Sequence, residues 1–302
     1  MASESRKAVV AAIAGNLAIA VSKGIAASFS GSAAMLSEAI HSLVDTGNGV
    51  LMLVGIRRSQ RPPDGDHPFG FGHELYFWTL MVGVLIFGLG GGMSIVTGVL
   101  HIRADKPVED LAWTYAVLAL AAVFEGVSWW FGWRAFDVER RGRGIVETII
   151  RTKDPTTFSV LLEDSAALLG LVFAFLGIFF GNLLRMPWLD GAASILIGVL
   201  LCAVAAVMVN ESRALLVGEG VSKATLDGIR ALALADSCVH DVGRLRSLYF
   251  GPEEVMLVIE VHLRDDSELV EVRDTMARLK KAIREKYPKI KRVFFDVTPT
   301  AT

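Results

Sequence analysis

Residues 30–48 read SGSAAMLSEAIHSLVDTGN, an apolar stretch of helical character that carries four polar side chains. These side chains are Glu38, His41, Asp45 and Asn48. An α-helix turns 100° per residue, so the four lie within an arc of about 80°. Ionisable groups are costly in a bilayer and face the interior of a bundle, and such a stripe therefore predicts a binding site or an ion pathway. A His and a carboxylate one turn apart can also bind the same divalent cation.

The distribution of charge divides the chain into two parts. The 302 residues are 53% hydrophobic, which is high for a soluble protein of this length. Asp, Glu, Lys and Arg are absent from residues 75–102, 165–184 and 191–209. Residues 211–302 hold 15 Lys and Arg and 15 Asp and Glu. We therefore expect a membrane domain over 1–210 and a soluble domain over 211–302.

Charge, cysteines and motifs argue against three other classes of protein. The net charge of −2, without a basic stripe interleaved with aromatics, gives no indication of nucleic-acid binding. Cys202 and Cys238 lie in different predicted domains, which does not support a disulfide framework. His73-Glu74 lacks the second His of the metallohydrolase motif H-E-x-x-H, and no nucleophile motif accompanies it. We do not expect an enzyme.

Six segments are long enough to cross a hydrocarbon core, which takes about 20 helical residues. They lie near 8–29, 33–57, 74–101, 111–136, 157–181 and 188–210. Lys and Arg gather before the first segment, after the second, and between the fourth and fifth, whereas the opposite loops hold Arg103, Lys106 and Arg185. The gathered basic residues are Arg6, Lys7, Arg57, Arg58, Arg61, Arg134, Arg140, Arg141, Arg143, Arg151 and Lys153. The positive-inside rule then predicts a multi-pass protein with both termini in the cytosol.

The soluble domain is predicted as an α+β unit with the order αββαβ. Helices are expected over 222–234 and 268–286, the second with the 3-4-3-4 apolar spacing of an amphipathic helix. Strands over 242–250 and 254–264 would form a hairpin that turns at Gly251-Pro252, and a last strand would follow over 291–298. Strict alternation in 255–263 predicts one buried and one open face of the sheet.

A second acidic pair, Glu163-Asp164, opens the apolar run of the fifth segment. Two adjacent carboxylates are difficult to keep ionised inside a bundle without a cation or protons. The second and fifth segments together could supply one imidazole and two or three carboxylates, enough for a tetrahedral divalent site. The alternative interpretation of His41 and Asp45 is a buried polar pair that holds helices together.

Three stretches together resemble the cation diffusion facilitators, and most of all their zinc transporter nine branch. They are SGSAAMLSEAIHSLVDTGN at 30–48, HPFGFGHELYFWTL at 67–80 and VLLEDSAALLG at 160–170, preceded by Asn16 and Lys23. This family comprises divalent-metal/proton antiporters with six spans and a cytosolic ferredoxin-like domain. The resemblance implies a proton-coupled exporter of Zn²⁺ that works as a homodimer in a lipid bilayer and needs no cofactor. Mn²⁺ or Fe²⁺ transport is one alternative, and a non-transporting metal sensor or interaction protein is another.

The resemblance also implies a transport site made of two residues four apart in each of two segments. His41 and Asp45 match the first pair, and Asp164 matches the acidic member of the second. The position four before Asp164, commonly a His in the family, is Val160 here. Glu163 is the substitute ligand we favour, although it projects about 100° from Asp164 on a helix. Glu38, Asn48 or water could complete the site instead.

Two further metal sites follow from the resemblance alone. Asp66 and His67 match part of a cluster in the loop before the third segment. His240, His262 and Asp296 match positions that hold metal ions between the soluble domains of family members. The alternative for the loop is that its Pro and Gly residues determine its shape, and the alternative for the soluble domain is a solvated surface His.

Four more polar residues in the membrane segments receive structural interpretations. Lys23 and Glu125 are expected to form an interhelical pair or, for the lysine, to reach towards the surface, in preference to a role in proton relay. Asp190 is expected to cap its own helix at the outer surface. His101 is assigned no role.

Overall fold

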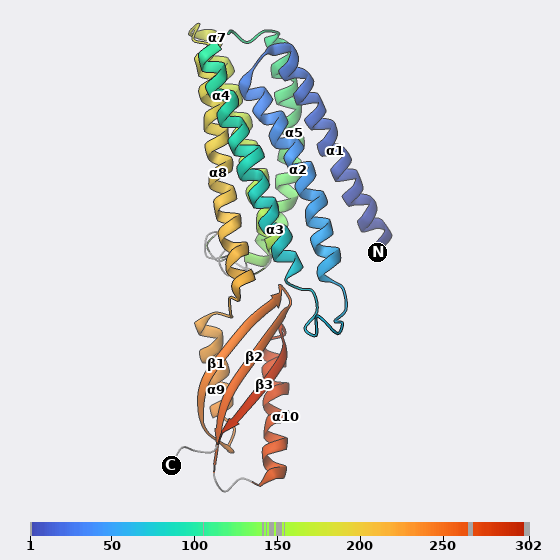
Figure 1. Cartoon of the computed structure of the whole chain (residues 1–302), viewed down its shortest axis with the longest axis vertical. Coiled ribbons are helices and arrows are strands. Elements are labelled where there is room, and N and C mark those ends of the chain that lie inside the picture. The colour runs from blue at the N-terminus through green and yellow to red at the C-terminus, as the bar shows by residue number, and fades with distance from the viewer. Residues whose placement is uncertain are drawn as a thin grey trace.

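The computed structural model describes residues 2–104, 106–140, 142, 144, 148, 153, 155–264 and 268–298, without the side chains of 2–15, 135, 138, 139, 155–157 and 298. Long helices form an elongated bundle, and a small sheet with two helices extends from one end of it (Figure 1). Arg141, Arg143 and Arg151 of the predicted basic loop lie outside the described residues.

The bundle contains the helices that the apolar runs predict. They are α1 (Ala2–Ser30), α2 (Ala33–Ser59), α3 (Glu74–Leu85), η1 (Ile86–Gly92), α4 (Met93–Ala104), α5 (Leu111–Arg140), α7 (Pro155–Leu183) and α8 (Trp188–Val217). Among the described residues, five segments are long and apolar enough to cross a membrane: α2, the continuous α3–η1–α4, α5, α7 and α8. α1 packs along α2 and α5 and completes the bundle (Figure 1). The predicted helical membrane domain is confirmed.

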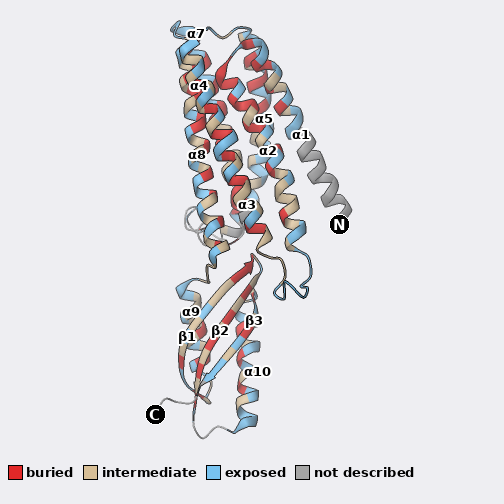
Figure 2. Ribbon diagram, viewed as in Figure 1, coloured by how far each residue is buried: buried red, intermediate tan, exposed pale blue. Residues whose placement is uncertain are grey.

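In the bundle, many large apolar side chains are exposed and several charged ones are buried, the reverse of the usual pattern in a soluble protein. Much of the helical surface is exposed (Figure 2). The exposed residues include large apolar side chains such as Phe29, Val123 and Phe131. Lys23 and Glu38, in contrast, are fully buried. This is the arrangement expected when lipid surrounds the bundle and polar groups face its interior.

Small residues let the third segment lie close against α8. A Cβ atom on Gly98 would come within 2.5 Å of the Gly191 carbonyl oxygen, and one on Gly198 within 2.7 Å of that of Gly91. Close backbone approach of this kind is how glycine contributes to helix association in membranes. The run of glycines at 88–92 forms η1, a wider helical turn inside the segment.

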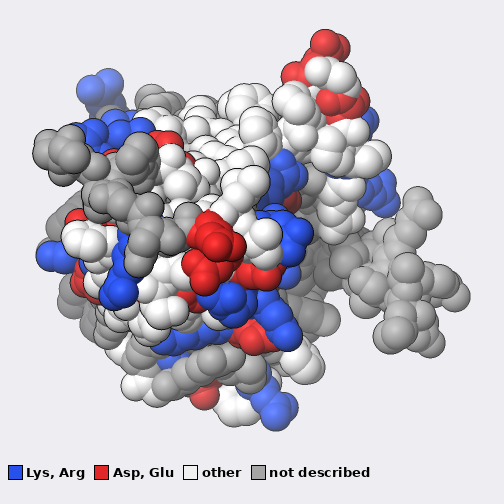
Figure 3. All heavy atoms as spheres, turned by 90° about the horizontal axis from the view of Figure 1, so that it is seen from below, with Lys and Arg blue, Asp and Glu red and all other residues white. Residues whose placement is uncertain are grey.

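The soluble domain has the predicted order αββαβ. It comprises α9 (Lys223–Leu234), β1 (Val239–Gly251), β2 (Glu254–Leu263), α10 (Leu269–Lys286) and β3 (Ile290–Thr298). β2 is the central strand, antiparallel to β1 and parallel to β3. Its alternating residues Val255, Leu257, Ile259, Val261 and Leu263 are buried as predicted, and this end of the molecule displays charges of both signs (Figure 3).

The two domains meet through the loop between α2 and α3. His73 Nε2 lies 2.9 Å from the Tyr249 carbonyl oxygen, and the Phe69 ring stacks on that of Phe250 at 5.2 Å between centroids. The Arg292 guanidinium lies over the Phe69 ring. Tyr76 at the start of α3 is part of the hydrophobic core of the soluble domain. α8 also contributes Leu215 to this core and continues to Val217, beyond the domain boundary expected at 210.

Candidate metal site

The polar stripe of α2 faces the interior of the bundle. Glu38, His41 and Asn48 are buried, and the Asp45 side chain is 14% exposed. α2 packs against α1, α7 and α8, among others, so this stripe lies among neighbouring helices rather than against lipid. The apolar residues of the same helix that face outwards, such as Leu43 and Val50, are exposed.

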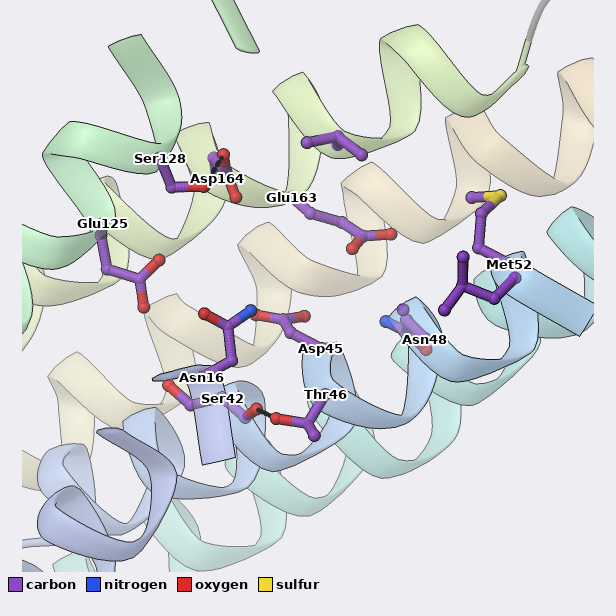
Figure 4. Close-up of a pocket in the computed structure, with 13 residues that line it drawn as sticks. Asn16, Ser42, Asp45, Thr46, Asn48, Met52, Glu125, Ser128, Glu163 and Asp164 are labelled. Carbon is purple, nitrogen blue, oxygen red and sulfur yellow. Dashed lines mark hydrogen bonds between the residues drawn. The ribbon is translucent and has the colours of Figure 1, made fainter. Parts of the chain in front are cut away.

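A pocket of about 250 Å³ opens beside this stripe, between α2, α5 and α7. Four acidic side chains line it from these three helices, and Asn16 reaches it from α1 (Figure 4). The acidic residues are Asp45, Glu125, Glu163 and Asp164. Such a concentration of carboxylates within an apolar bundle requires cations, protons or both to compensate it.

His41 lies next to Asp45 and has no hydrogen-bond partner for either ring nitrogen among the described residues. Its Nδ1 atom lies 3.5 Å from Asp45 Oδ1, one helical turn away, as the spacing predicts. A buried polar atom without a partner carries a desolvation cost of about 1–3 kcal/mol. Neutral imidazole nitrogen is a common metal ligand, and an ion held here would satisfy it.

On α7, both acidic residues face the pocket despite their different directions on the helix (Figure 4). Asp164 Oδ2 accepts a hydrogen bond of 2.9 Å from the Ser128 hydroxyl, whereas Glu163 Oε1 has no hydrogen-bond partner within the described part of the chain. Val160 lines the same pocket and offers no ligand atom. Glu163 thus shares the pocket with Asp164 and with Val160, the position where the second imidazole was expected.

The candidate ligands lie too far apart to coordinate one ion in this structure. No three of the described His, Cys, Asp and Glu side chains are close enough together to hold a metal ion. Both Glu163 and Asp164 of α7 line the pocket, but of the α2 pair only Asp45 does, because His41 is not among the lining residues. A bound ion would have to draw these two pairs together.

Lys23 and Glu125 form the interhelical pair that the sequence predicts. Lys23 Nζ lies 3.4 Å from Glu125 Oε1 and 3.2 Å from Glu38 Oε2. It also donates a hydrogen bond of 2.8 Å to the Ser42 hydroxyl. Glu38 therefore faces Lys23 and is not among the residues that line the pocket.

Asp190 does not cap its own helix, contrary to our prediction. α8 begins after Pro187, and the Asp190 carboxylate instead reaches the first turn of α2. It accepts hydrogen bonds of 2.6 Å from the Ser32 hydroxyl and 2.5 Å from the Ala33 amide. His101 Nε2 lies 3.5 Å away, so this residue has a neighbour that the sequence did not indicate. The Asp190 carboxylate is stabilised at the start of α2 because the first turn of an α-helix offers free amide donors and a favourable dipole.

This contact predicts the effect of Asp190→Ala. The substitution leaves the donors at the start of α2 without their acceptor, and we expect a loss of about 1–3 kcal/mol of stability. Thermal unfolding of the detergent-solubilised protein measures this loss. Glu109→Ala, which removes an exposed carboxylate near the same end of the bundle, is the control and should leave the melting temperature unchanged. Equal melting temperatures for the two variants would contradict the prediction.

The loop site pairs His67 with a residue other than the expected one. His67 Nδ1 lies 3.0 Å from Asp64 Oδ1, and the same oxygen accepts the amides of Asp66 and His67. The His67 amide, as the largest of these contributions, lowers the pKa of Asp64. Asp66 contributes its backbone amide to this turn.

In the soluble domain, His262 and Asp296 share the face of the sheet away from the helices. Asp296 on β3 pairs with Glu260 on β2, and His262 Nε2 lies 3.7 Å from Glu260 Oε1. His240 falls at an irregularity of β1, between the paired residues Val239 and Asp241. Glu260 neighbours both His262 and Asp296, but it was not among the metal ligands that we predicted from the sequence.

Fold and site together define a multi-pass membrane protein with an acidic pocket inside its helical bundle. The chain belongs to the cation diffusion facilitators: the family model of the cation efflux transmembrane domain matches residues 9–217.

Three relatives illustrate the range of this similarity. The mitochondrial proton-coupled zinc antiporter SLC30A9 of Xenopus laevis is 34% identical over 235 residues, which is 77% of this chain and 42% of the relative. Metal tolerance protein C4 of Arabidopsis thaliana is 29% identical, over 77% of this chain and 51% of its own. Magnetosome protein MamM of Paramagnetospirillum magneticum is 26% identical, over 79% of this chain and 71% of its own. The chain thus spans less than half the length of the zinc antiporter it matches.

Proposed function

We propose that this protein carries a divalent metal cation across a membrane in exchange for protons, with Zn²⁺ as the preferred ion. The observation that carries the proposal is the pocket where α2 and α7 present Asp45, Glu163 and Asp164, next to His41, whose ring nitrogens have no hydrogen-bond partner within the described part of the chain. The relative named as a proton-coupled zinc antiporter supports both the ion and the coupling.

The proposed ligands are His41, Asp45, Glu163 and Asp164. One imidazole and three carboxylates suffice for the tetrahedral coordination that Zn²⁺ favours. A set with a single nitrogen and several oxygens also suits Mn²⁺ or Fe²⁺ better than a set with two imidazoles would. Mn²⁺ and Fe²⁺ are therefore the alternative cargoes of the same site.

Proton coupling follows from the chemistry of the ligands. Metal binding requires neutral imidazole and ionised carboxylate, so protons and metal compete for the same side chains. A site that faces the metal-rich compartment releases protons as the ion binds. When it faces the other side, protons return and displace the ion, and a rocking motion of the helices would alternate its access.

The proposed orientation places both termini and the soluble domain in the cytosol, following the positive-inside rule. The cation then enters from the side of the soluble domain and leaves at the end where Asp190 meets α2. We assign homodimerisation to the soluble domain, with metal sensing through His240, His262 and Asp296 as a further role.

The test is uptake of Zn²⁺, Mn²⁺ and Fe²⁺ into proteoliposomes across an imposed pH gradient. We expect the fastest uptake for Zn²⁺, and movement of protons in the opposite direction. A non-transporting metal sensor is the second candidate function, favoured by the acidic and His residues on the open face of the sheet. Absence of flux for all three ions in vesicles with folded protein would favour it.

Val160→His tests how the ligand set determines the choice of ion. Val160 lines the pocket four residues before Asp164 and is 43% exposed, so an imidazole fits there without displacing the core. A second imidazole suits Zn²⁺ better than Mn²⁺, and we expect the ratio of Zn²⁺ to Mn²⁺ uptake to rise about tenfold, or 1.4 kcal/mol. Val160→Leu is the control for size and should leave the ratio unchanged. A ratio that falls in Val160→His would contradict the proposed ligand position.

A further inference from the structure

Lys23 is a buried cation that the proposed metal chemistry does not use. Its side chain is fully buried on α1, and its ammonium group lies between α2 and α5. The Ser42 hydroxyl and the carboxylates of Glu38 and Glu125 surround it at 2.8–3.4 Å. Three oxygens match the three N–H donors of a lysine.

The contact with Glu125 connects this cation to the pocket. Glu125 lines the pocket together with Asp45 and the acidic pair of α7 (Figure 4). Its Oε1 atom lies 3.4 Å from Lys23 Nζ. Glu38 is fully buried, and its Oε2 atom lies 3.2 Å from the same ammonium group. Lys23 therefore engages two carboxylates at the edge of the proposed site.

The contacts of Lys23 with Glu38 and Glu125 affect metal binding through the negative charge that remains available to the ion. Five carboxylates lie in this part of the bundle: Glu38, Asp45, Glu125, Glu163 and Asp164. Lys23 holds two of them, which leaves three for a cation in the pocket. An ion surrounded by all five would be bound more tightly, and such an oxygen-rich set favours hard ions such as Mn²⁺. A transport site must also bind weakly enough to release its ion.

We propose that Lys23 is a specificity-determining residue, a built-in counter-cation that withholds Glu38 and Glu125 from the transported metal. It limits the negative charge offered to the ion, and so permits release and disfavours hard cations. This inference rests on the proposed function, because it assumes that the pocket binds the cargo.

The experiment is a series of variants that changes the charge beside the pocket in single steps. Titration calorimetry on the full-length protein in detergent measures the Kd for Zn²⁺ and Mn²⁺, with Asp45→Asn as the background for ions bound elsewhere. We expect Lys23→Met to bind Zn²⁺ about tenfold more tightly, Mn²⁺ by a larger factor, and to transport Zn²⁺ more slowly. Glu38→Gln should bind about tenfold more weakly. Lys23→Met/Glu38→Gln should return to the wild-type Kd, as should Lys23→Arg.

A purely structural lysine predicts a different pattern. Lys23→Met would then weaken binding or leave it unchanged, and Lys23→Met/Glu38→Gln would not bind more tightly than Glu38→Gln; either result overturns the inference. If Lys23→Met does not fold, the test rests on the Kd of Lys23→Met/Glu38→Gln compared with that of Glu38→Gln. Wild-type Zn²⁺ binding and flux in Asp45→Asn would instead refute the proposed function. If Asp45→Asn is inactive but the Lys23 and Glu38 variants all bind with the wild-type Kd, only the Lys23 inference is refuted.

Discussion

Asp45→Asn is expected to reduce the initial rate of Zn²⁺ uptake into proteoliposomes by at least about 100-fold. Loss of residues that merely support a metal ligand costs 10–100-fold, and removal of a ligand should cost more. Asn has nearly the same size, so the pocket keeps its shape while it loses one negative charge. His41 Nδ1, 3.5 Å from Asp45 Oδ1, would lose this anionic neighbour. The rate is measured with a Zn²⁺-sensitive dye inside the vesicles at a fixed pH gradient.

Asp137→Asn is the matched control for this variant. Asp137 lies on α5 with a half-exposed side chain paired to Arg140 at 3.0 Å, outside the pocket. The same chemical change there should leave uptake at the wild-type rate. Uptake by Asp45→Asn within a factor of two or three of wild type, in correctly folded protein, would refute the assignment of the transport site.

Gly72→Ala is expected to separate the loop between α2 and α3 from the soluble domain. A Cβ atom at Gly72 would overlap the carbonyl group of Phe250, so the loop cannot keep its position against the hairpin. Overpacking of this kind typically costs about 1–3 kcal/mol. We expect faster amide hydrogen exchange at 67–76 and 248–256, by about tenfold or more, because local opening there becomes less costly. Exchange mass spectrometry in detergent measures it.

Gly65→Ala provides the control in the same loop. A Cβ atom at Gly65 meets nothing within 4 Å, so this substitution should leave exchange in both segments unchanged. If both variants behave alike, the contact between loop and hairpin is not what holds the two domains together. If Gly72→Ala also slows metal uptake while Gly65→Ala does not, docking of the soluble domain supports transport.

Local pattern was sufficient for most of the fold. Long charge-free runs predict membrane helices, because backbone groups in lipid must be satisfied within the segment. Period-two alternation predicted which residues of β2 are buried, and the spacing of His41 and Asp45 predicted their contact. These features depend on residues near one another in the chain.

Asp190 shows where such reasoning fails. Its place near the start of α8 suggested a cap for that helix, yet its carboxylate binds the start of α2, more than 150 positions away in the chain. Glu260 and Asp64 are similar cases, since each is the partner of a predicted residue that the sequence motif did not include. The choice among several possible partners depends on how helices and strands pack.

The sequence by itself determined that a membrane bundle carries His41, Asp45 and an acidic pair on α7, because hydropathy and helical periodicity are local properties. Only the tertiary structure decided which other groups approach them. It brought Glu163 into the pocket beside Asp164 and assigned Glu38 to Lys23, although both carboxylates were open alternatives for the same ligand position. The reason is physical: a buried charge must find a partner, and the distances that decide between partners exist only once the helices are packed.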